Sequence, residues 1–136
     1  LSDALTAHQT LIGVWVQRHM LLPEHAQTKQ NASIRLTARF FESLTNPEMQ
    51  GATMADHAEH LGVTPTHLAR ASRTATGLTA ADHLTARLVY HARRALKDTK
   101  KTAKDIASDL HFGSAAYFTR FIHQHTGLTP SELRQN

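Results

Sequence analysis

Apolar residues recur every three or four positions along most of the chain, which is the spacing of an amphipathic α-helix. Glycine and proline, which interrupt helices, contribute only 6 and 4 of the 136 residues. The pattern therefore predicts an all-α fold. The length is sufficient for one compact domain with its own core and an additional segment.

Two helices are predicted before residue 47. Ser2 is a suitable N-cap for the first helix, whose apolar positions end at Leu22-Pro23. The polar residues 28–31 then predict a linker, after which Ser33 would cap a second helix that stops before Asn46-Pro47. We accordingly expect a division between residues 1–30 and a main domain, residues 31–136.

The chain repeats itself from residue 53 onward. Thr53-Met-Ala-Asp56 and Thr102-Ala-Lys-Asp105, 49 residues apart, are both helix starts in which a hydroxyl caps free backbone amides. After one additional residue in the second copy, two motifs of the first copy recur 50 residues later. They are Leu68-x-Arg70, repeated as Phe118-x-Arg120, and Thr76-Gly77-Leu78-Thr79, repeated as Thr126-Gly127-Leu128-Thr129. A period near 50 that occurs only twice predicts a duplicated supersecondary unit rather than a solenoid.

Each copy has the order helix, tight turn, helix, at about residues 53–77 and 102–127. Gly62 suits a turn residue with positive φ, and His111 occupies the matching place in the second copy. The predicted fold class is thus all-α, with two helix-turn-helix subdomains joined by a long connecting helix and an additional N-terminal helix.

The second helix of each copy carries side chains suited to duplex DNA. Arginine binds guanine bidentately, while threonine and alanine contact thymine methyl groups, so the outward face near each helix start is a candidate for base reading. The candidates are Thr66, His67, Ala69, Arg70 and Arg73 in the first copy, and Ala115, Ala116, Thr119, Arg120 and His123 in the second. The candidates for donating to phosphates at the helix starts are Thr64, Ser114 and Tyr117.

The connecting helix, predicted from about Ala80 to Lys97, sets the distance between the copies. Its length of roughly 27 Å approaches the spacing of about 34 Å between successive major grooves on one face of DNA. Lys100 and Lys101 follow it in a lysine cluster that is a candidate for phosphate contact, although exposed lysines are commonly just solvated. The net charge of +4 resides in residues 31–136, which favours an anionic partner.

With these motifs the chain resembles the AraC/XylS family of bacterial transcriptional regulators over about residues 33–136. The resemblance rests on Leu68-x-Arg70, Thr76-Gly77-Leu78-Thr79, Arg87-Leu88, Ile106-Ala107, Phe112, Tyr117-Phe118-x-Arg120 and Thr126-Gly127-Leu128-Thr129-Pro130. It implies two recognition helices in adjacent major grooves of double-stranded DNA, Arg70 and Arg120 among the base readers, and activation through contact with RNA polymerase.

The resemblance also bears on residues 1–30, which would be the tail of an upstream effector-binding and dimerisation region or a linker. A homodimer through that upstream region is therefore expected. The chain starts with Leu1 rather than methionine, which suggests a fragment of a longer protein.

Several positions depart from the family pattern. Phenylalanine is usual where Ser72 and Ile122 stand, lysine where Arg73 and His123 stand, and glycine where His111 stands. Serine at a normally buried aromatic position would loosen the first unit unless a neighbour fills the gap. We therefore expect the two units to contribute unequally to DNA binding.

Two alternatives remain open. The chain could be a basic helical protein-interaction module that docks on an acidic partner without specific DNA readout. Alternatively, the first unit could be degenerate, so that only the second unit reads bases.

Other classes of protein find little support in the sequence. The absence of cysteine excludes disulfides, Cys-ligated zinc and thiol catalysis. His57 and His60, at i and i+3, could share a ligand but lack an evident third partner, so we expect neither a metal nor a cofactor. No nucleophile with a base and no acid pair stands out, and an enzyme is not expected. The longest apolar run, residues 11–16, is too short to span a membrane, and we expect a cytoplasmic protein.

Overall fold

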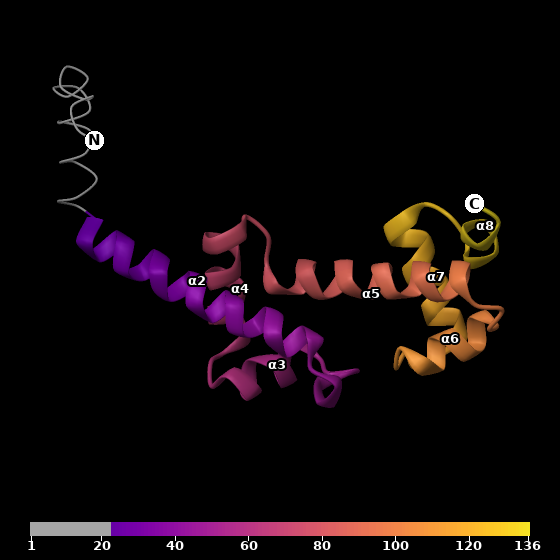
Figure 1. Ribbon diagram of the computed structural model, residues 1–136, viewed down its shortest axis with the longest axis horizontal. Helices are drawn as coiled ribbons and strands as arrows, with labels where there is room; N and C mark the ends of the chain where they lie inside the picture. Colours follow the sequence, from indigo (N-terminus) through magenta and orange to yellow (C-terminus); the bar gives the residue numbers. More distant parts are fainter. Residues whose placement is uncertain (1–22) are drawn as a thin grey trace, which may run out of the picture.

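The computed structural model describes residues 23–136, in which every regular element is helical (Figure 1). The elements are α2 (Pro23–Thr45), η1 (Pro47–Met49, a 3-10 turn), α3 (Met54–Leu61), α4 (Pro65–Thr76), α5 (Ala80–Asp98), α6 (Ala103–Asp109), α7 (Ala115–Thr126) and α8 (Pro130–Gln135). Helix α5 joins a subdomain at each of its ends, which confirms the predicted all-α fold with two helix-turn-helix units. The helix expected between Ser2 and Leu22 lies outside the described residues.

Helix α2 runs without interruption from Pro23 to Thr45. The linker predicted at residues 28–31 and the helix start predicted at Ser33 are therefore both wrong. The polar residues 28–31 are exposed side chains on one continuous helix, and none of them is proline or glycine, so nothing in them breaks the helix. Farther along, α2 buries Phe40 completely in the first core, and this tertiary packing stabilises the helix.

The first subdomain consists of α2, α3 and α4, with the start of α5. Helix α2 packs mainly along α4 and also touches α3, so it forms a third helix that covers the helix-turn-helix pair. The buried apolar residues that form this core are Leu36, Phe40, Ala58, Leu61, Leu68, Ala71 and Ala80.

The second subdomain consists of α6, α7 and α8, packed on the C-terminal half of α5. Here α8 and α5 cover the helix-turn-helix pair, as α2 does in the first subdomain. The buried apolar residues of this core are Ala92, Leu96, Ile106, Ala107, Phe118, Ile122 and Leu133. The two cores share no residue, so each unit has its own hydrophobic support.

Hydrogen-bonded caps fix the starts of the helices as the sequence predicts. Threonine and acid side chains form reciprocal capping boxes at α3, α5 and α8, with the pairs Thr53/Asp56, Thr79/Asp82 and Thr129/Glu132. Hydrogen bonds from the capping threonines lower the pKa of all three carboxyl groups. At α6 the Thr102 hydroxyl accepts a hydrogen bond from the Asp105 amide at 3.1 Å.

The turns of the two units each have a residue in the left-handed conformation at the matching position. Gly62 has φ 74°, and His111 has φ 65° in the matching place, as predicted. A non-glycine residue at positive φ is strained by contact between its Cβ and the backbone, so the second unit pays this conformational cost and the first does not.

Ser72 is fully buried and its hydroxyl donates a hydrogen bond to the Leu78 carbonyl at 2.7 Å. Its counterpart Ile122 is also fully buried but packs in the apolar core of the second unit. The first unit has thus exchanged apolar packing at this position for a polar link between α4 and the turn that follows it.

Candidate nucleic-acid interface

The two candidate reading helices, α4 and α7, start in the same way. The Thr64 hydroxyl accepts a hydrogen bond from the His67 amide at 3.1 Å, and the Ser114 hydroxyl accepts one from the Tyr117 amide at 3.0 Å. Both hydroxyls are exposed and retain their own proton, which each can donate to a phosphate oxygen. Exposed amides at a helix start also attract anions, so both starts are suited to a DNA backbone.

The base-reading candidates lie on the faces of α4 and α7 that point away from the cores. Helix α4 buries Leu68, Ala71 and Ser72, and α7 buries Phe118 and Ile122. Ala69 and Ala115 are half-buried. The remaining candidates on the two helices are exposed: Thr66, His67, Arg70, Arg73, Ala116, Tyr117, Thr119, Arg120 and His123.

Arg70 and Arg120 occupy matching positions in the repeat. Both side chains are exposed, and neither makes a hydrogen bond or ion pair with another residue in the part of the chain that the structure describes. All five N–H donors of each guanidinium are therefore available for an external acceptor.

Arg73 and His123 also match, in the last turns of α4 and α7, and each affects the pKa of the acid in the capping box of the next helix. The pKa of Asp82 is lowered mainly by hydrogen bonds from Thr79 and further by the charge of Arg73. The pKa of Glu132 is lowered in the same way by Thr129 and then by His123. Neither Arg73 nor His123 forms an ion pair with these acids among the described residues.

The lysines after α5 are not equivalent. Lys101 Nζ lies 2.7 Å from Asp109 Oδ2, and this ion pair raises the pKa of the lysine. Lys100 is exposed and forms no ion pair among the described residues. Lys100 is therefore better placed to bind a phosphate, because Lys101 would first have to break its ion pair with Asp109.

Helix α5 separates the reading helices. Its 19 residues correspond to roughly 28 Å, and α4 and α7 lie near its opposite ends (Figure 1). This length is close to the predicted value and comparable with the repeat of the major groove, at about 34 Å.

The structure places α2 beside the first reading helix, which the sequence did not predict. A groove of about 750 Å³ between α2 and α4 is lined by Lys29 and Gln30 on one side and by His67 and Arg70 on the other. Because the sequence predicts a linker at residues 28–31, it does not identify Lys29 as a neighbour of the first reading helix. The helical start at Pro23 and the absence of a glycine or proline in residues 24–45 are the signals that could have revealed it.

His57 and His60, the candidate ligand pair, differ in exposure. His57 is buried, with Nδ1 at 2.6 Å from Ser43 Oγ, whereas His60 is exposed. No group of three or more potential metal ligands occurs among the described residues. Over the same residues, no helix combines the length and the apolar character that crossing a membrane requires.

Comparison with known proteins gives the same picture. Residues 57–136 match the family model described as "Helix-turn-helix domain". The chain is 26% identical over 121 residues to the melibiose operon regulatory protein of Escherichia coli K12, covering 85% of this chain and 40% of that protein. It is 34% identical over 87 residues to the transposon Tn10 TetD protein of Escherichia coli, covering 64% of this chain and 63% of that protein. The chain thus spans less than two thirds of these relatives.

Solved structures share the fold at lower identity. The C-terminal domain of the two-component response regulator yesN from Fusobacterium nucleatum matches with a TM-score of 0.62 and 22% identity, over 76% of this chain and 98% of that one. A transcriptional regulator with an AraC-type DNA-binding domain from Chromobacterium violaceum matches with a TM-score of 0.58 and 22% identity, over 73% of this chain and 91% of that one.

Proposed function

The chain belongs to the AraC/XylS family of helix-turn-helix DNA-binding transcription regulators, which are not enzymes, and from this premise we propose how it binds DNA. Helices α4 and α7 enter adjacent major grooves on one face of the duplex. The observation that carries this proposal is the matched pair of capped, outward-facing helices at the two ends of α5.

Arg70 and Arg120 act as the principal base readers. Support comes from their matching places in the repeat, their exposure and the absence of an intramolecular partner in the described chain. A guanidinium without such a partner can bind the O6 and N7 atoms of guanine without first breaking an ion pair. Thr64, Ser114 and Tyr117 contact phosphates, and Lys100 adds affinity that does not depend on base sequence.

The two units contribute unequally. The reading face of the first unit offers polar and charged groups at Thr66, His67 and Arg70, whereas that of the second begins with Ala115 and Ala116, which offer only apolar contact. We expect the first unit to impose the more stringent base preference.

We propose further that this domain serves to activate transcription. Contact with RNA polymerase and dimerisation through an upstream region are part of this proposal, as is a cytoplasmic location. One of the relatives carries the name "Probable transcription factor PqrA", from Proteus vulgaris, with 29% identity over 87 residues.

In vitro selection from random duplexes tests the geometry. We expect enriched sequences with two conserved blocks about one helical turn apart. A single conserved block would contradict binding by both units. A chain that binds no duplex at low salt would instead favour the interaction module with an acidic protein partner.

Gel-shift titration of a selected duplex at fixed salt tests the readers. Arg70→Ala and Arg120→Ala should each weaken binding by about 1–3 kcal/mol and relax preference in one block only. Arg93→Ala is the matched control, because Arg93 is exposed on α5 and forms no ion pair among the described residues. Wild-type affinity in both reader variants would refute the assignment.

A further inference from the structure

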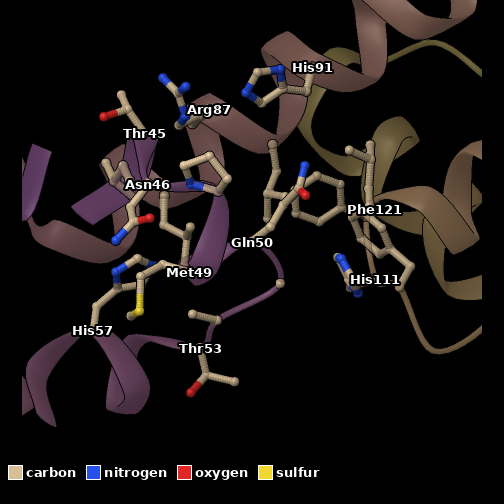
Figure 2. Close-up of a pocket in the computed structure, with 18 of the residues that line it drawn as sticks. Thr45, Asn46, Met49, Gln50, Thr53, His57, Arg87, His91, His111 and Phe121 are labelled. Carbon is tan, nitrogen blue, oxygen red and sulfur yellow. The ribbon is translucent and has the colours of Figure 1, made fainter. Parts of the chain in front are cut away.

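A cavity of about 440 Å³ lies between the two units (Figure 2), and Tyr117 is the one proposed DNA-contacting residue in its lining. One wall is the segment that joins α2 to α3, residues 44–53 except Glu48, and a second is the middle of α5. The third wall comes from the second unit, at residues 110–112 and on α7. Its volume is within the range of cavities that hold a single small molecule.

One fixed positive charge, that of Arg87, lies at the α5 wall of this cavity, next to an ionisable histidine. Arg87 and His91, one helical turn apart, lie next to each other there and are both half-buried (Figure 2). None of the residues that line the cavity is aspartate or glutamate. Arg87 has no ion-pair partner anywhere in the described chain. A half-buried guanidinium without a counter-charge is a binding group for an anion.

The electrostatics of His91 agree with this placement. Burial lowers the pKa of His91, and the charges of Arg87 and Arg94 lower it further. An anion bound beside Arg87 would offset that repulsion and would strengthen its own binding by favouring the protonated imidazole.

The rest of the lining is largely apolar and partly aromatic. Leu84 and Leu88 extend from α5, Met49 comes from the joining segment, and Phe121 and Phe112 come from the second unit. These five side chains are all half-buried, so they can cover the apolar body of a ligand whose charged group lies at Arg87.

The geometry points to a binding site for a small organic anion, a carboxylate or phosphate monoester with an aromatic body, that bridges the two helix-turn-helix units. Such a ligand contacts both units at once and thereby fixes their relative orientation. DNA that requires both reading helices at a set spacing would then bind with a different affinity when the ligand is present. This regulatory step rests on the proposed function, whereas binding of the anion does not.

A backbone phosphate of DNA has the same charge but a different shape. A duplex phosphate has no apolar body that could fill the space between Met49, Leu88 and Phe121. The apolar lining therefore favours a small molecule, and the experiment separates the two sources.

The 136-residue chain is titrated with benzoate and with phenyl phosphate, and benzamide serves as the uncharged control. Methyl resonances of Leu84 and Leu88 report on the cavity, and those of Leu36, in the first core, serve as the remote reference. We expect saturable shifts of Leu84 and Leu88 with at least one anion, and binding at least about tenfold weaker for benzamide. Equal shifts with benzamide, or none with either anion, would overturn the site.

Three variants locate the anion. Arg87→Gln should weaken binding about tenfold or more, whereas Arg93→Gln, six residues farther along and about 240° around α5, should leave it unchanged. Gln50→Trp should block the cavity without removing a charge, because Gln50 is exposed and is one of the residues that line the cavity (Figure 2). Binding that survives both Arg87→Gln and Gln50→Trp would exclude this cavity.

Duplex titrations test the coupling and the alternative source of the anion. Saturating probe should change the affinity for a two-block duplex by about threefold or more and leave a single-block duplex unaffected. Displacement of the probe by the single-block duplex would identify the site as a DNA phosphate contact and overturn the proposal. An unchanged affinity for the two-block duplex, with the probe bound, would reject the regulatory step alone. A chain that binds the probe but no duplex would contradict the proposed function and leave the site intact.

Discussion

Gly51 lies directly against the imidazole ring of His111, so that a Cβ placed on Gly51 would be 2.6 Å from His111 Cγ. Gly51 belongs to the segment between α2 and α3, and His111 is the left-handed turn residue of the second unit. The contact therefore connects the two units through their loops. Both residues have positive φ, 81° at Gly51 and 65° at His111, which makes this a demanding place for any larger side chain.

Gly51→Ala should destabilise the protein by more than the cost of placing alanine in a left-handed conformation. The new methyl group would clash with the ring and the residue would also adopt an unfavourable φ, for a loss of roughly 2–4 kcal/mol in the free energy of unfolding. Gly62→Ala is the matched control, because Gly62 has φ 74° and no atom within 4 Å of a Cβ. It should lose only about 1–2 kcal/mol.

Urea titration of both variants, and of each in a His111→Gly background, measures the contact itself. Without the ring, Gly51→Ala should have the same effect as Gly62→Ala, because only the φ penalty remains. Equal losses for the two alanine variants in the wild-type background would show that the ring moves away at no cost.

The buried hydroxyl of Ser72 gives a second stability prediction. Ser72→Ala removes the 2.7 Å hydrogen bond to the Leu78 carbonyl, which retains a weaker contact with Thr76 Oγ1 at 3.2 Å. We expect a loss of about 1 kcal/mol by chemical denaturation. Ser108→Ala, at an exposed serine in α6, should change stability by less than about 0.5 kcal/mol. A loss no greater than that control would mean that the hydroxyl contributes nothing to the first unit.

His57 makes stability depend on pH. Burial lowers its pKa below 6.5; the Asp56 carboxylate partly opposes this shift, and His60 adds to it. Between the folded and unfolded pKa values, the unfolded chain binds a proton that the folded chain does not. The free energy of unfolding should therefore fall as pH decreases from about 6.5, and His57 should contribute no slope above that pH.

Urea unfolding of the wild type and of His57→Gln between about pH 5 and pH 8 isolates this contribution. The variant should have a shallower dependence below pH 6.5, because the other histidines contribute equally to both proteins. Identical slopes would assign the pH dependence to residues other than His57. The Ser43 hydroxyl, 2.6 Å from Nδ1, can hydrogen-bond either the neutral ring or a glutamine amide, which helps the variant to fold.

Local sequence chemistry predicted the parts of the fold that depend on neighbouring residues. The caps at Thr53 and Thr102 and the left-handed turns at Gly62 and His111 are all visible in a few consecutive residues, and all are confirmed. The matched period also predicts the two units. The proposed reading residues remain predictions, although the structure leaves most of them exposed.

What the sequence did not predict depends on contacts between distant residues. The polar residues 28–31 are a weak helix signal, and their helix is stabilised farther along, where Phe40 packs in the first core. The ion pair between Lys101 and Asp109 and the contact between Gly51 and His111 likewise join segments that no local pattern relates.

The continuous α2 helix leads to a prediction about DNA affinity. Lys29 lines the same groove as His67 and Arg70 on the first reading helix, so a phosphate beside that helix would lie within reach of its ammonium group. Lys29→Gln should lower affinity for all duplexes alike and reduce the slope of log K against log salt by about 0.9, the value for one lost phosphate contact. Arg35→Gln is the matched control on α2, because Arg35 is exposed, does not line the groove and lies about 240° around the helix. Equal slopes for Lys29→Gln and Arg35→Gln would confine the interface to the two helix-turn-helix units and exclude α2 from it.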